Sequence, residues 1–169
     1  QALGYAFLDK DGKQVLPGAR GLKDITEITA AYVIPELAEC KFRVACDVTN
    51  PLCGELGCSS IYGPQKGATP EMIQDMDQWL GAYAELAKER FPKADAKYPG
   101  TGAAGGMGFA FLTFTDAVLE SGINIVLDET KLEDYIKDAD LVITGEGRMD
   151  GQTAMGKAPV GVAKLAKKY

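Results

Sequence analysis

The sequence predicts an α/β fold in which a mostly parallel or mixed sheet is flanked by helices. Residues 141–144 form a short apolar run with Val and Ile, typical of a strand buried in a parallel sheet. From Gly106 onward, helix and strand patterns alternate along the chain. The 169 residues are 46% hydrophobic and 25% charged, as in ordinary globular proteins. We therefore expect one α/β unit over residues 1–169, large enough for a hydrophobic core.

The first elements are short. Residues 5–8 and 14–16 are expected to be strands joined by a hairpin-type turn, and a helical turn is expected after Pro35. A strand over residues 41–48 brings Asp47 to its carboxyl end. Ligands of open α/β sheets bind at such strand ends, so Asp47 is a candidate site residue.

A long helix is predicted to begin at Thr69, which supplies a capping hydroxyl before Pro70 and Glu71. Apolar residues then recur at spacings of three and four, which indicates one apolar face through about five turns. They are Met72, Met76, Trp79, Leu80, Tyr83 and Ala87. We interpret this helix as scaffold.

The second half of the chain begins with a glycine-rich stretch. The elements expected after it are an apolar helix over 109–119, a strand over 123–128, a short helix over 131–137, the strand over 141–144 and a helix over 158–169.

Composition excludes several function classes. A net charge of −6 argues against a surface for duplex nucleic acid, and no run reaches the ~18 apolar residues that cross a bilayer. No signal-peptide pattern follows Gln1, so we expect a cytoplasmic protein. The chain has no histidine, which removes Ser-His-Asp and Cys-His catalysis. Its four cysteines lack C-x-x-C spacing and are expected to be buried free thiols.

The loop after residues 141–144 carries charged groups among glycines. Lys157, just before a helix with Pro159 in its first turn, could neutralise a phosphate or a carboxylate. Glu146 and Asp150 offer oxygen atoms that suit magnesium or accept a proton, although they could equally be capping groups. Gly151-x-x-x-x-Gly156-Lys157 narrowly misses the P-loop, because Ala158 stands where Ser or Thr is required.

A second glycine pattern, Gly100-x-Gly102-x-x-Gly105, matches the dinucleotide fingerprint, with Asp128 downstream as a candidate ribose ligand. However, the residues before it are polar and end in Pro99, which makes a poor central strand. Other readings are close approach of the backbone to an anion, or plain helix packing. Lys66, in a loop fixed by glycine and proline, could be a ligand or simply solvated.

Five segments together resemble the bacterial glycerate kinase family, of the glycerate 2-kinase type. In order along nearly the whole chain, they are residues 44–52, 63–68, 102–106, 141–153 and 156–159. The resemblance covers the central portion of those enzymes and implies a fragment of a two-lobed α/β kinase, truncated at both ends. A lobe boundary is expected near residue 128, with residues 129–169 in a flavodoxin-like lobe.

The resemblance implies ATP-dependent phosphorylation of D-glycerate with Mg2+, 2-phosphoglycerate being the favoured product, in a cleft between the lobes. The matched positions suggest roles by their chemistry: Asp47, Asp150 and Lys66 in catalysis, Glu146 as the metal ligand, and as substrate or phosphate ligands Asn50, Gly102, Gly105, Gly106, Arg148 and Lys157. The partners of this protein would be ATP, D-glycerate and the missing parts of the same chain. The fragment alone would lack part of the cleft. A non-catalytic phosphate-binding or regulatory module and an NAD-dependent dehydrogenase are the alternatives.

Overall fold

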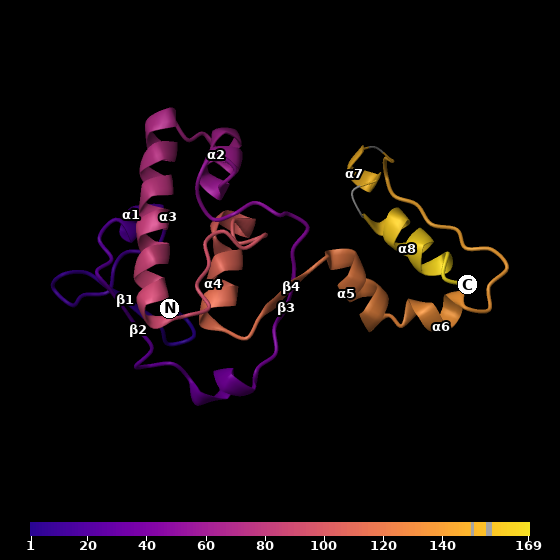
Figure 1. The fold of residues 1–169 in the computed structure, drawn as a ribbon, viewed down its shortest axis with the longest axis horizontal. Helices are drawn as coiled ribbons and strands as arrows, with labels where there is room; N and C mark the ends of the chain where they lie inside the picture. The colour runs from indigo at the N-terminus through magenta and orange to yellow at the C-terminus, as the bar shows by residue number, and fades with distance from the viewer. Residues whose placement is uncertain (150, 155–156) are drawn as a thin grey trace. The chain divides into compact units, whose positions relative to one another are not determined.

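The computed structural model describes residues 1–149, 151–154 and 157–169. The chain forms two compact units, residues 1–119 and 120–169, which are described separately below (Figure 1). The mixed α/β class is confirmed, with small sheets flanked by helices. The position expected for a lobe boundary, residue 128, lies inside helix α5 (Gly122–Glu129). A boundary between lobes there stays a prediction.

The first unit begins with a two-stranded antiparallel sheet. Strand β1 (Ala6–Leu8) pairs with β2 (Glu27–Thr29), with Phe7 opposite Ile28. The expected hairpin return is reduced to one bridge, between Leu8 and Gln14. Its turn is held by Asp9 Oδ1, which accepts from the backbone nitrogens of Lys13 and Asp11 at 2.9 Å each. These bonds, first that from Lys13, lower the pKa of Asp9.

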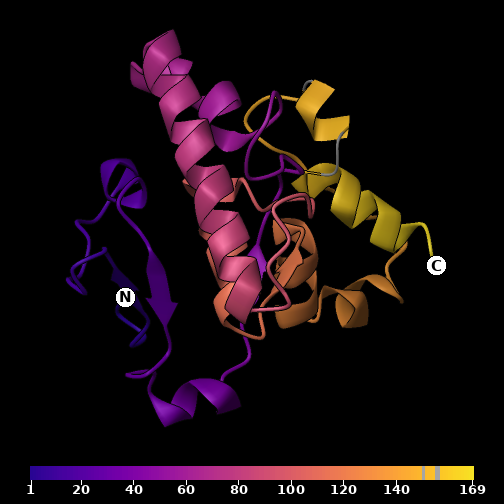
Figure 2. The same ribbon diagram turned by 60° about the vertical axis from the view of Figure 1, so that its left-hand side comes forward.

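Helix α3 (Pro70–Arg90) confirms the predicted capped helix. The Thr69 hydroxyl accepts from Met72 N at 3.3 Å, as expected for an N-cap. Only the later part of the apolar face is buried: Leu80, Tyr83 and Ala87 lie in the core, whereas Met72, in the first turn, is 45% exposed. Figure 2 shows the same long helix from a second side, with the N-terminal strands along it.

An aromatic cluster forms the core of the first unit. Phe109 is fully buried, and its ring meets that of Tyr83 edge to face, with centroids 5.4 Å apart. Further rings lie at the first strand and at two helix ends: Tyr5 just before β1, Phe7 in β1, Phe91 just after α3 and Phe114 at the end of α4. Burial raises the pKa of the Tyr83 phenol. This core fixes α3 against α4 (Met107–Phe114).

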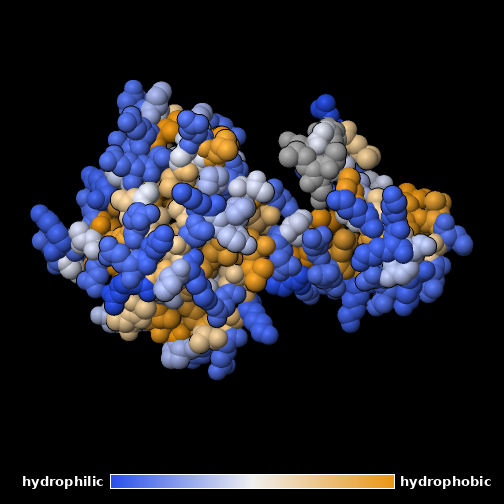
Figure 3. Space-filling model, viewed as in Figure 1, coloured by the Kyte–Doolittle hydropathy of each residue, from blue (hydrophilic) through white to orange (hydrophobic). Residues whose placement is uncertain are grey.

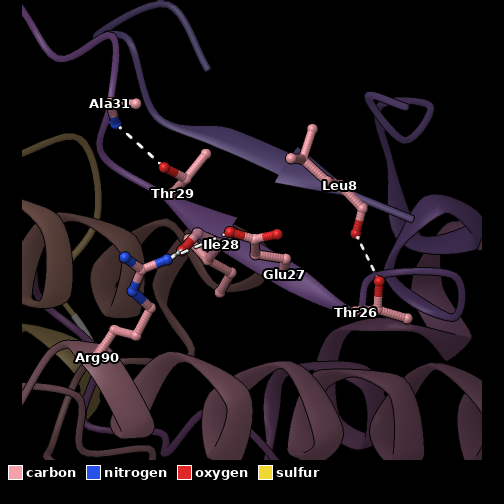
Figure 4. A network of polar contacts seen from close by, with 7 residues as sticks. All are labelled: Leu8, Thr26, Glu27, Ile28, Thr29, Ala31 and Arg90. Carbon is pink, nitrogen blue, oxygen red and sulfur yellow. Dashed lines mark hydrogen bonds and ion pairs between the residues drawn. The ribbon is translucent and has the colours of Figure 1, made fainter. Parts of the chain in front are cut away.

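Arg90, at the end of α3, ties that helix to strand β2 (Figure 4). Its Nη1 donates to the Ile28 carbonyl at 3.1 Å and lies 3.4 Å from Glu27 Oε1. Ile28 is 1% exposed, so this bond satisfies a carbonyl at the edge of the core.

Short elements connect these parts. They are α1 (Ala19–Leu22), the 3-10 helices Pro35–Glu39, Pro64–Lys66 and Ala103–Gly105, β3 (Arg43–Ala45), α2 (Cys58–Tyr62) and β4 (Val118–Glu120). The helical turn after Pro35 is confirmed. Strand β3 is shorter than expected and pairs with β4, where Val118 N donates to Phe42 O at 2.9 Å. The apolar helix ends at Phe114 rather than at residue 119.

The second unit is helical. It contains α5, α6 (Leu132–Ile136), α7 (Gly151–Ala154) and α8 (Ala158–Ala166). Helices α5 and α8 pack closely at Gly161, where a Cβ atom would lie 2.3 Å from Ile123 Cγ1. Helices α6 and α8 confirm the helices predicted over 131–137 and 158–169, although α8 ends at Ala166.

Two expected strands are wrong. Residues 123–128 lie in α5, where Ile123 packs against Gly161 of α8. Residues 141–144 form no strand, and Leu141 and Ile143 are 77% and 87% exposed. A buried strand needs neighbours for its backbone groups, and the described residues offer this segment no ladder. In the described part of the chain the strands therefore form two two-stranded sheets, β1 with β2 and β3 with β4, to which these two segments do not contribute.

Apolar surface lies among hydrophilic residues on both units (Figure 3). Within the residues that the structure describes, no helix is both long and apolar enough to cross a membrane.

Candidate functional site

Asn50 joins three segments of the first unit. Its Oδ1 accepts from the Tyr62 hydroxyl at 2.6 Å, and its Nδ2 donates to Leu56 O at 2.9 Å. Its backbone oxygen accepts from Gly102 N at 2.9 Å. Two predicted site residues, Asn50 and Gly102, are thus in direct contact. Both polar atoms of the Asn50 amide make hydrogen bonds within the protein, and its role as a ligand stays a prediction.

A cavity of about 540 Å3 lies in the same unit and contains three further predicted residues, Lys66, Gly105 and Gly106. Its walls are mainly apolar and come from α1, α2, α3 and α4, including Leu22, Tyr62, Met76, Leu80, Met107 and Ala110. Lys66 is exposed at the end of its 3-10 helix. The cavity therefore combines apolar walls, a cation and glycine backbone.

The glycine-rich loop turns tightly into α4. Gly105 and Gly106 have φ values of +72° and +103°, in the left-handed region that favours glycine. No contact would restrict a Cβ atom at Gly105, so its surroundings are open. At Gly102 the reason for glycine is different: a Cβ atom there would lie 2.3 Å from Pro51 O.

The dinucleotide fingerprint is not supported by the structure. Residues 93–99, all of which are described, contain turns and no strand leading to Gly100. Asp128 lies in helix α5 rather than at a strand end. Because the fingerprint requires a strand before its first glycine, the glycines here have another role.

Asp47 was expected at the end of a strand over residues 41–48; it lies two residues after β3, which ends at Ala45, and is exposed. It does not line the cavity that contains Lys66. The other predicted residues of this unit lie together. Lys66, Gly105 and Gly106 line the cavity, and Tyr62, which also lines it, bonds Asn50, which in turn bonds Gly102.

The other predicted residues belong to the second unit. Glu146 is half-buried and accepts a hydrogen bond from the Thr153 hydroxyl, which is itself buried. Arg148 and Lys157 are exposed, and Lys157 N donates to Thr153 O at 3.3 Å ahead of α8. Asp150 lies outside the described residues, as does Gly156. Thr153 is a neighbour of Glu146 that the sequence analysis missed.

The described residues contain no group of three or more Cys, Asp or Glu side chains that could hold a metal ion. Magnesium is commonly held by one or two carboxylates together with substrate phosphates. A single half-buried carboxylate, Glu146, fits that kind of site.

Two cysteines, Cys53 and Cys58, follow Asn50 in the chain, and Cys58 lines the cavity. Burial is the main cause that raises the pKa values of Cys53 and Cys58 above the ordinary value of 9.0, and the charge of Asp77 raises both further. All four cysteines are free, as expected, but only Cys58 is buried: Cys46 and Cys53 are half-buried and Cys40 is exposed. Thiols whose pKa values are raised above 9.0 remain protonated in neutral solution.

These pKa shifts predict alkaline destabilisation. A raised folded-state pKa contributes stability that is fully present below the unfolded value, 9.0, and is lost as the pH rises through the folded value. We expect the melting temperature to fall above about pH 9, and to fall less in the variant Cys53→Ser/Cys58→Ser. Thermal melts across this range provide the measurement, with Cys40→Ser as the control. An equal fall in the double variant would contradict the prediction.

Comparison with known proteins decides the family. The model of the glycerate kinase family matches residues 1–169, the whole chain. The chain belongs to the glycerate kinase family. The resemblance seen in the five segments is thereby confirmed.

Individual relatives agree over the full length of this chain. It is 50% identical to a glycerate kinase of Haemophilus influenzae and 48% identical to a glycerate 2-kinase of Escherichia coli, each over 169 residues. It also matches the crystal structure of a protein assigned as glycerate kinase 2 from Salmonella typhimurium LT2, with a TM-score of 0.93, 48% identity and 100% of this chain covered. The chain spans 45%, 44% and 45% of these proteins, respectively.

Tyr62 is the main residue of this region that the sequence analysis missed. Its position just before Gly63-Pro64, at the start of the loop with Lys66, was the available signal. Nothing in the sequence indicated its bond to Asn50, because that contact depends on the path of the loop between them.

Proposed function

We propose that this protein takes part in the ATP-dependent phosphorylation of D-glycerate, giving 2-phosphoglycerate. The observation that carries the proposal is the family match over residues 1–169, together with the convergence of Lys66 and the glycine loop on one cavity. A cytoplasmic location is part of the proposal.

Lys66 is proposed to neutralise a phosphate of ATP or the carboxylate of glycerate. The mainly apolar walls around it favour ATP, because a nucleotide base has apolar faces and glycerate has almost none. Phosphoryl transfer depends chiefly on positioning and charge neutralisation, which a lysine beside open glycine backbone can supply. Arg148 and Lys157, both exposed cations, are the proposed anion ligands of the second unit.

Glu146 would hold magnesium. When bound, magnesium supplies charge neutralisation to the phosphate oxygens. The Thr153 hydroxyl, by donating to the Glu146 carboxylate, restricts the orientation of that side chain.

A carboxylate, Asp47 or Asp150, is proposed to accept the proton of the attacking glycerate hydroxyl. Asp47 follows a strand end, and Asp150 belongs to the loop that resembles the family. We propose that one of the two acts as the base. General-base catalysis is worth about 10² to 10⁴-fold in rate, so loss of the base should be measurable.

The experiment compares Asp47→Asn and Asp150→Asn in the full-length protein with ATP and D-glycerate. We expect one variant to lose about hundredfold or more in kcat and the other to lose far less. Asp75→Asn, exposed on α3, serves as the control. Wild-type kcat in both variants would overturn the proposed base, and absence of turnover in the wild type would favour a non-catalytic phosphate-binding module.

A further inference from the structure

We propose that Tyr62 is a positioning residue for phosphoryl transfer, an inference that rests on the function proposed above. Its hydroxyl donates to Asn50 Oδ1 at 2.6 Å, while its ring lines the cavity that contains Lys66. Tyr62 thus connects the segment of Asn50 with the cavity that contains Lys66.

The Asn50 side chain is held from two directions. Tyr62 restrains its oxygen, and Leu56 O accepts from its nitrogen at 2.9 Å. The loop that carries Leu56 is anchored in turn, because Gly54 N donates to both carboxylate oxygens of Asp77 at 2.9 and 3.0 Å. An asparagine restrained in this way keeps a fixed backbone position, from which its carbonyl binds Gly102 N.

Tyr62 also stands at the base of the loop with Lys66. It is the last residue of α2, and the following Gly63 N donates to Ser59 O at 3.0 Å. Lys66 N then donates to Gly63 O at 2.9 Å. Only this short, internally bonded turn separates Tyr62 from Lys66, so the tyrosine determines where the turn begins.

The Tyr62–Asn50 bond therefore connects the Lys66 turn to the Gly102 loop. Both segments contribute to the proposed site, and phosphoryl transfer requires the groups around the phosphate to be aligned. Loss of the hydroxyl would leave the Asn50 oxygen without its donor and allow the amide to rotate. The ring, which fills the cavity wall, would remain in phenylalanine.

The test uses Tyr62→Phe, Asn50→Ala and the double variant in the full-length protein, with ATP and D-glycerate. We expect Tyr62→Phe to lower kcat about tenfold while both KM values stay within about twofold, because alignment matters most in the transition state. We expect the double variant to be no slower than Asn50→Ala, because the two residues act as one unit. Tyr32→Phe, whose side chain is 75% exposed, is the control.

Melting temperatures separate positioning from folding. A purely structural tyrosine would lower the melting temperature and leave kcat unchanged well below it, and that outcome would overturn the inference. A kcat in the double variant that falls by the product of the two single-variant factors would overturn the inference as well. No turnover by the wild type would overturn the proposed function and this inference together, whereas wild-type kinetics in Tyr62→Phe would overturn the inference alone.

Discussion

Replacement of Lys66 by alanine is expected to lower kcat/KM for phosphorylation of D-glycerate by ATP about a hundredfold in the full-length protein. Lys66 is the cation of a mainly apolar cavity that also contains Gly105 and Gly106. A cation that contacts the transferring phosphoryl group stabilises the charge of the transition state, so its removal should cost much of the transition-state stabilisation. Steady-state kinetics with each substrate varied in turn provide the measurement.

The same kinetics identify the group that Lys66 binds. If it binds a phosphate of ATP, the KM for ATP should rise in Lys66→Ala and the KM for glycerate should not; contact with the glycerate carboxylate predicts the reverse. Lys66→Arg keeps the charge and should retain more activity than alanine. Lys88→Ala, an exposed lysine on α3, is the control. Unchanged kcat/KM in Lys66→Ala would exclude this lysine from the site.

Replacement of Gly102 by alanine is expected to destabilise the protein by about 2 kcal/mol, through overpacking. The added Cβ atom would lie 2.3 Å from Pro51 O and 3.1 Å from Asn50 O, and both are backbone atoms that cannot move aside cheaply. The bond from Gly102 N to Asn50 O would lengthen as the two segments separate. Because that bond is part of the proposed site, kcat should fall too.

Chemical denaturation of Gly102→Ala measures the loss, with Gly81→Ala as the matched control. Gly81 lies within α3, where a Cβ atom would meet nothing within 4 Å. Alanine at that position should raise the free energy of unfolding by about 0.5 to 1 kcal/mol, because it restricts the unfolded chain and favours helix. A Gly102→Ala protein as stable as wild type would contradict the close packing of this loop.

The sequence predicted correctly those elements whose stabilising features lie within the element itself. Helix α3 was predictable because its cap, its proline and its apolar spacing all lie within the helix itself. The short apolar run at residues 123–128 was ambiguous, since periodicity alone does not separate a buried strand from a helix. Residues 141–144 could form a strand only with partners elsewhere, which a local pattern does not reveal.

The candidate site was predictable in its residue types and less so in its contacts. The family resemblance identified Asn50, Lys66 and the glycine loop, and the structure brings them into one region. The role of Tyr62 depends on a side-chain bond across twelve residues, which the sequence could not indicate. The expectation that Gly102 binds an anion stays a prediction, and the structure adds a reason for glycine that the sequence did not show: a Cβ atom there would lie 2.3 Å from Pro51 O.

The most direct test of the proposed activity follows the product by phosphorus NMR when the full-length protein is incubated with ATP, Mg2+ and D-glycerate. We expect ADP and 2-phosphoglycerate to appear together in equal amounts, and omission of D-glycerate to abolish ADP formation. No phosphorylated glycerate, or ADP formation that does not depend on glycerate, would contradict the proposed activity.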